Sequence, residues 1–146
     1  MKAFITGITG MVGSHLAEFL LEETDWEIHG LIRWRSPLDN IENLISKINS
    51  KDRVFLHYGD LRDSQSLDLV IQKVKPDYTF HLAAQSYPKT SFDAPLDTYA
   101  TNISGTSSLL EALKKYSPQS IIHVCASSEV FGRVPKEKLP IDEECS

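Results

Sequence analysis

The chain has 146 residues, 41% of them hydrophobic and 24% charged, which is enough for one globular domain with its own core. Its formal net charge of −5 gives no general attraction to nucleic acids or to anionic membranes, and no apolar stretch is long enough to cross a bilayer. We therefore expect neither nucleic acid nor a membrane as a partner.

The cysteines and histidines give no pattern typical of a metal site. Cys125 and Cys145 lack metal-ligand spacing, and the five histidines are scattered along the chain. Cys125 ends an apolar run and is expected to be a small core residue. Met1 leads straight into an apolar strand with no export signal, so the expected location is the reducing cytoplasm.

Strand and helix patterns alternate along the chain. Short apolar runs predict strands, and apolar residues three and four apart predict helices. The predicted strands are, in chain order, 2–5, 27–32, 53–57, 78–82 and 120–125. The predicted helices are 12–20, 41–48, 67–74 and 103–113. This alternation predicts an α/β fold, a Rossmann-type doubly wound parallel sheet with strand order 3-2-1-4-5.

The alternation stops after the fifth predicted strand. Residues 126–146 are loop-like, with two prolines and several acids, and no closing helix or sixth strand follows. We expect residues 1–146 to form a nucleotide-binding domain at the front of a longer protein, with the rest of the fold and a substrate domain further on. A naturally short protein is the alternative.

A glycine-rich segment joins the first strand to the first helix, with the spacing Gly-x-x-Gly-x-x-Gly. Between a strand and a helix, such a loop lets the backbone approach a nucleotide, while the N–H groups of the first helical turn point at its phosphates. The residues predicted to contact the nucleotide here are Gly7, Thr9, Gly10, Met11, Val12 and Gly13.

Arginines follow the second strand. Arg33 lies about twenty residues beyond Gly13, where an acid would bind the ribose 2′-hydroxyl of NAD but an arginine can pair with a 2′-phosphate. Arg35 and Ser36 add further donors, so NADP is favoured over NAD. The alternative is that both arginines are solvated loop cations.

The third and fourth strands also end in candidate cofactor contacts. Asp60, followed by Leu61, is placed to accept a hydrogen bond from the adenine amino group, with a turn or cap aspartate as the alternative. Leu82, Ala83 and Ala84 are small or apolar and would let a dinucleotide lie against the backbone. A tightly packed strand end explains the same residues without a ligand.

A hydroxyl and a carboxylate follow the fifth strand. Ser127 could hold a substrate hydroxyl, and Glu129 could move a proton if a partly dry pocket raises its pKa toward neutrality. The alternative is a turn serine beside an exposed glutamate. The position at the end of this strand favours the catalytic interpretation.

Together, segments 6–13, 59–61, 81–84 and 127–129 resemble the extended short-chain dehydrogenase/reductases, the NAD(P)-dependent epimerase/dehydratase family. The resemblance covers the whole chain and is greatest to the GDP-mannose 4,6-dehydratases. It implies conversion of GDP-mannose to GDP-4-keto-6-deoxymannose, with hydride passing to tightly bound NADP and back to the sugar.

The resemblance also assigns residues. Ser127 matches the position of the family's catalytic threonine, and Glu129 that of its catalytic glutamate. It implies cofactor contact by Ser86, substrate contacts by Ser86 and Ser128, and a homodimer or homotetramer built partly on a helix within 96–116.

Three departures keep other functions open. The segment around Ser127 also resembles a related reductase, residues 86–89 differ from the dehydratase pattern, and no Tyr-x-x-x-Lys pair follows Gly132. A GDP-4-keto-6-deoxymannose reductase or a nucleotide-sugar 4-epimerase is therefore the alternative on the same fold. A non-catalytic NADP-binding module is the alternative of another class. The 146-residue chain alone is not expected to turn over substrate.

Overall fold

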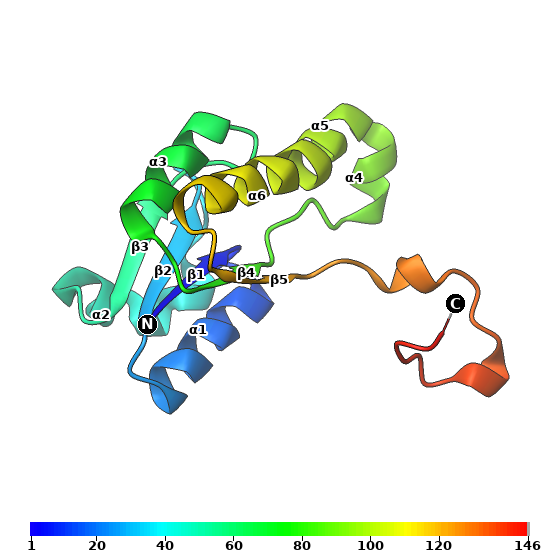
Figure 1. Ribbon diagram of the computed structural model, residues 1–146, viewed down its shortest axis with the longest axis horizontal. Helices are drawn as coiled ribbons and strands as arrows, with labels where there is room; N and C mark the ends of the chain where they lie inside the picture. The colour runs from blue at the N-terminus through cyan, green and yellow to red at the C-terminus, as the bar shows by residue number, and fades with distance from the viewer. Residues whose placement is uncertain (146) are drawn as a thin grey trace.

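The computed structural model describes residues 1–145, apart from the side chain of Ser128, and its centre is a five-stranded parallel sheet (Figure 1). The strands are β1 (Lys2–Thr6), β2 (Glu27–Ile32), β3 (Val54–Tyr58), β4 (Tyr78–His81) and β5 (Ile121–Val124). Their order, β3-β2-β1-β4-β5, confirms the predicted topology, and every strand boundary lies within one residue of its predicted position.

Helices cover both faces of this sheet. The long ones are α1 (Met11–Glu23), α3 (Ser64–Val74) and α6 (Gly105–Tyr116). The predicted helix 41–48 is instead a 3-10 segment, η1 (Asp39–Leu44), followed by the short α2 (Ile45–Ser50). Non-helical backbone angles at Ile41 break it.

The helical region before α6 begins earlier than the apolar spacing predicted. It starts with α4 (Pro88–Asp93) and α5 (Pro95–Tyr99) and continues through a π-helical segment, η2 (Ala100–Ser104). Pro88 and Pro95 each stand in the first turn of their helix, where a missing N–H costs nothing. Two 3-10 turns follow β5, namely η3 (Ser128–Phe131) and η4 (Lys136–Lys138).

Two apolar clusters form the core, one on each face of the sheet. Ala3 and Ile5 of β1 face α1, whereas Phe4 between them packs with α3 and α6. Both faces of β1 are thus buried, which is why its residues 3–5 form a continuous apolar run. In register, Ala3 lies between Ile28 of β2 and Tyr78 of β4.

The last strand and the segment after it are open to solvent. All four residues of β5 are exposed, and neither core cluster of described residues includes one of them. The expectation that Cys125 is a core residue is therefore wrong, because Cys125 ends an exposed edge strand and is itself exposed. Beyond it, the chain runs away from the sheet as an arm (Figure 1). Among the described residues, no helix has the length and apolar character needed to span a membrane.

A histidine pair joins β2 to β3. The Nδ1 atom of His29 lies 3.0 Å from the Nε2 atom of His57, and the rings stack with their centroids 5.2 Å apart. Burial, together with the nearby His29 and Lys73, lowers the pKa of His57 to about 4. Burial also lowers the pKa of His29, against the opposing effect of Glu27. The folded protein therefore keeps both rings neutral near neutral pH.

This pair makes stability depend on pH. Below the ordinary histidine pKa of 6.5, these two histidines bind protons in the unfolded chain but stay neutral in the folded protein. The free energy of unfolding is therefore expected to fall between about pH 6.5 and about pH 4. Urea-unfolding midpoints across this range measure the effect. His57→Gln should make the decline shallower, whereas His15→Gln, at a side chain that is 76% exposed, should not. An identical slope in all three proteins would contradict this account.

Candidate functional site

A pocket of about 500 Å³ opens at the carboxyl ends of β1 to β4, where open parallel sheets bind ligands. Residues that directly follow each of these strands contribute to its wall. The predicted cofactor residues that line it are Gly7, Thr9, Gly10, Arg33, Ser36, Asp60, Leu61, Leu82, Ala83, Ala84 and Ser86. The predicted residues Met11, Val12, Gly13 and Arg35 are not among its lining residues.

The glycine-rich loop is held close to its neighbours. Gly7 has a φ of +76°, and a Cβ there would lie 3.0 Å from the backbone nitrogen of Ala83. A Cβ on Gly13 would lie 2.2 Å from the carbonyl oxygen of Gly7. These glycines let α1 and β4 approach the loop. Gly13 thus acts through packing.

The N-terminus of α1 is open to the pocket side of this loop. Gly10 is the N-cap, its N–H donates to the Gly7 carbonyl at 2.9 Å, and among the described residues no side chain caps the helix. The first turn contains no acidic residue. The N–H groups of Met11 and Val12 belong to this turn, where backbone donors attract phosphate. The side chains of Met11 and Val12 are exposed.

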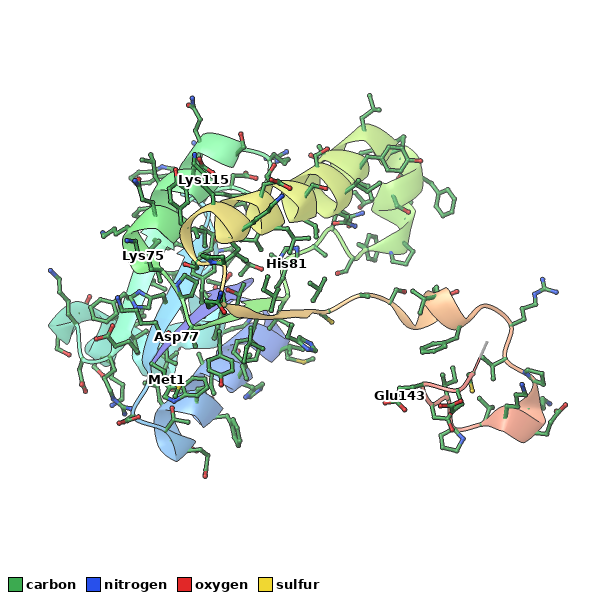
Figure 2. All side chains as sticks on the ribbon, in the orientation of Figure 1. Met1, Lys75, Asp77, His81, Lys115 and Glu143 are labelled. Atoms are coloured by element: carbon green, nitrogen blue, oxygen red, sulfur yellow. The ribbon has the colours of Figure 1, made fainter. Side chains whose placement is uncertain are left out.

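A buried histidine, His81, contacts Thr6 at the start of the glycine-rich loop. His81 lies between the sheet and α6 (Figure 2), and its Nδ1 and Nε2 atoms lie 2.8 and 2.9 Å from the hydroxyls of Thr6 and Thr106. The Thr6 oxygen accepts the N–H groups of Leu82 and Ala83, so its own proton goes to Nδ1 and the Nε2–H donates to Thr106. Burial lowers the pKa of His81, which is therefore a neutral structural link.

The loop after β4 is fixed by a residue that periodicity did not single out. The side-chain oxygen of Asn102 accepts the N–H of Gln85 at 2.8 Å, and its amide donates to the Gln85 carbonyl at 2.9 Å. The Gln85 side chain in turn donates to the Thr98 hydroxyl. Asn102 sits in the π-helical segment η2, and such segments recur at functional sites. Its role follows only from its tertiary partner.

Asp60 has a second role besides lining the pocket. Its Oδ1 accepts the backbone N–H of Arg62 at 2.9 Å, and its carboxylate pairs with the Arg62 guanidinium. The Arg62 side chain holds the pKa of Asp60 below its usual value. Asp60 therefore stabilises a turn, which was the alternative to a cofactor contact, and it also lines the pocket. Arg62 and Asp97, also in the lining, were not predicted.

The turn after β2 presents Arg33. The Ser36 hydroxyl accepts the Arg33 N–H at 3.0 Å, and the Ser36 N–H donates to the Arg33 carbonyl at 3.0 Å. Arg33, whose side chain is exposed, and Ser36 both line the pocket. Arg35, on the same turn, is exposed and lies outside the lining.

The two predicted catalytic residues are not brought to the pocket. Ser127 caps η3, its hydroxyl accepting the N–H of Glu129 at 3.2 Å, and both residues are exposed on the arm. The side chain of Ser128, a predicted substrate contact, lies outside the described residues. Ser86, the other one, lines the pocket. Among the described residues, no three His, Cys, Asp or Glu side chains cluster as a metal site would require.

The parallel sheet, the glycine-rich loop and the pocket at the strand ends define a Rossmann-type domain of the short-chain dehydrogenase/reductase class. A UDP-glucose 4-epimerase from Stenotrophomonas maltophila with bound NAD matches it with a TM-score of 0.82 at 23% identity, covering 100% of this chain and 42% of that one. A Thermus thermophilus UDP-glucose 4-epimerase in complex with NAD matches with a TM-score of 0.76 at 28% identity, covering 93% and 41%.

Sequence comparison narrows the class. The family model for GDP-mannose 4,6 dehydratase matches residues 4–146, and the chain belongs to this family. GDP-mannose 4,6 dehydratase of Drosophila melanogaster is 42% identical over 138 residues, covering 90% of this chain and 35% of the relative. The Homo sapiens enzyme is 41% identical, covering 90% and 37%. The chain thus spans little more than a third of these curated relatives.

Proposed function

We propose that the full-length protein is an NADP-dependent GDP-mannose 4,6-dehydratase, a lyase that forms GDP-4-keto-6-deoxymannose. The family match supports the reaction, since the relatives carry this name. The observation that carries the cofactor proposal is the pocket at the strand ends, whose lining includes both the glycine-rich loop and Arg33.

The residues present fit a nicotinamide dinucleotide. The uncapped N-terminus of α1 suits the pyrophosphate, Asp60 and Leu61 suit the adenine, and the Arg33–Ser36 turn suits a ribose 2′-phosphate. Ala83 and Ala84 leave room along the wall. Bound here, the dinucleotide would supply hydride acceptance and return. The protein's task is to orient it and to exclude water.

Ser127 and Glu129 are the proposed catalytic pair. They follow β5, which pairs with β4, and the β4 end forms part of the pocket wall. The Ser127 hydroxyl would donate to the C4 oxygen of the sugar, where negative charge develops. The Glu129 carboxylate would take the C5 proton and pass it to the departing C6 hydroxyl, which leaves as water. When hydride returns to C6, Glu129 would relay a solvent proton back to C5.

The test uses the full-length protein, purified with its bound nucleotide and incubated with GDP-mannose without added NADPH. Mass spectrometry should show loss of one water with no net use of cofactor. An unchanged sugar nucleotide would contradict the dehydratase. Stoichiometric use of NADPH with the 4-keto sugar would then indicate a reductase. Conversion of a nucleotide sugar to an isomer of equal mass would indicate an epimerase, and absence of any turnover would indicate a binding module.

We also infer a homodimer or homotetramer that works in the cytoplasm. The segment 96–116 carries the exposed apolar side chains of Leu96, Tyr99, Ile103 and Leu110, a surface that a second copy could cover. Cys125 and Cys145 are free thiols, which suits a reducing compartment. Light scattering on the full-length protein tests the oligomer, since a monomer would contradict it.

Arg33→Ala is expected to weaken NADP binding about 10- to 100-fold, the loss of a charge-assisted contact to phosphate, with little change in NAD binding. Titration calorimetry with both nucleotides measures this ratio. Arg35→Ala should have a smaller effect, because this side chain is outside the pocket lining. Lys114→Ala, an exposed cation of α6, is the control. An unchanged preference in Arg33→Ala would refute the assignment.

A further inference from the structure

One guanidinium group connects two walls of the pocket. The Nε and Nη2 atoms of Arg62 donate to the two carboxylate oxygens of Asp60 at 3.2 and 3.0 Å. Its Nη1 donates to the Asp97 carboxylate at 2.6 Å, and Asp97 belongs to α5, 35 residues further along the chain. All three side chains line the pocket.

We propose that Arg62 is a positioning residue of the nucleotide pocket, which orients Asp60 and at the same time docks helix α5 against the adenosine end. This inference rests on the proposed nucleotide site. A planar fork of five donors can serve two carboxylates at once, which a lysine ammonium does with far less geometric control.

The pairing leaves Asp60 able to bind a ligand. Oδ1 accepts the backbone N–H and the Nε of Arg62, whereas among the described residues Oδ2 accepts only Nη2. Each carboxylate oxygen can accept two hydrogen bonds, so Oδ2 keeps one site for an adenine amino group. Arg62 also keeps Asp60 ionised, because it lowers the pKa of that carboxyl. The guanidinium thus fixes both the direction and the charge of the acceptor.

Helix α5 needs such an anchor. Within 88–104, all of which the structure describes, no residue is buried, and Leu96 is 80% exposed. A five-residue helix without apolar burial is not stable by itself. Its region is held by polar contacts, with Arg62 reaching from the β3 side while Thr98 and Asn102 bind Gln85 on the β4 side.

Isolated surface ion pairs contribute little, so the arrangement here is what matters. Pairs become significant when an arginine binds a carboxylate through two nitrogens or joins a network, and Arg62 does both. Lys115 provides the contrast, as an exposed cation that pairs with Asp68 between α6 and α3 at 2.9 Å (Figure 2). That pair lies outside the pocket lining.

The experiment compares Arg62→Met with Lys115→Met in the full-length protein. Arg62→Met should weaken NADPH binding about tenfold, the size of one lost charge-assisted hydrogen bond. Without nucleotide, it should also speed amide hydrogen exchange in 95–104. Lys115→Met should do neither. Arg62→Lys should restore the binding only partly, since it cannot hold both carboxylates in the same geometry.

Asp97→Asn keeps the Asp60 contact and removes only the charge on α5, so it tests the link if Arg62→Met fails to fold. It should speed exchange in 95–104, and adding it to Arg62→Met should cause no further loss. If Arg62→Met binds NADPH and exchanges its amide hydrogens as the wild-type protein does, the inference about Arg62 is overturned. The proposed nucleotide site still stands in that case, provided that the wild-type protein binds NADPH. Failure of the wild-type protein to bind NADPH would overturn both.

Discussion

Replacing Glu129 by glutamine is expected to lower kcat for the loss of water from GDP-mannose about 100- to 10,000-fold, the usual contribution of general acid–base catalysis. The amide cannot take the C5 proton, whereas oxidation at C4 does not need it. In deuterated water, the wild-type product should acquire deuterium from solvent, and the variant should release almost none of this product. Mass spectrometry of the sugar nucleotide measures both.

Glu137→Gln is the matched control, because Glu137 is another exposed acid on the same arm, within η4. It should leave product formation unchanged. Normal turnover by Glu129→Gln would exclude Glu129 as the base. Nucleotide binding measured on both variants shows whether a loss of turnover arises from the chemistry or from a damaged cofactor site.

The largest effect on stability is expected from Gly13→Ala. The new Cβ would lie 2.2 Å from the Gly7 oxygen and 2.8 Å from both the Gly7 carbonyl carbon and the Ile8 Cα. These are backbone atoms, so the helix or the loop must move. Overpacking of this kind should lower the free energy of unfolding by about 3 kcal/mol. Urea unfolding measures the change, and NADP binding should weaken with it.

Gly10→Ala is the control for Gly13→Ala, because it shows whether the loop tolerates a side chain away from the close contact between Gly13 and Gly7. Among the described atoms, a Cβ there would meet only the Gly7 oxygen, at 3.2 Å. The backbone at Gly10, with φ −81° and ψ 167°, suits any residue. The loss should be less than about 1 kcal/mol, since alanine is merely a poorer N-cap than glycine. Equal losses in the two variants would contradict the close packing of α1 on Gly7.

Much of the architecture could be predicted from the sequence because it depends on local pattern. Central parallel strands are buried on both faces, so residues 3–5 of β1 read as an uninterrupted apolar run at the observed place. The right-handed crossover rule then restricts the strand order. Since parallel strands end at one edge, the residues that follow them, from Gly7 to Ser86, could be expected around one pocket.

Features that depend on partners distant in sequence were not predictable in this way. The bond from Arg62 to Asp97 spans 35 residues and that from His81 to Thr106 spans 25, and no spacing rule connects either pair. The exposure of Cys125 was missed because an apolar run does not reveal whether anything covers its strand. Asn102 likewise becomes meaningful only beside Gln85.

By itself, the sequence of this protein determined the order of the sheet, the glycine-rich loop and the set of strand ends that form the pocket. These follow from the burial pattern and chirality of short segments. Only the tertiary structure decided that Arg62 pairs with the Asp60 carboxylate, that α5 is held by polar contacts, and that Ser127 and Glu129 lie on an exposed arm. Such facts depend on which side chains meet when the chain folds, and a local pattern does not contain that information.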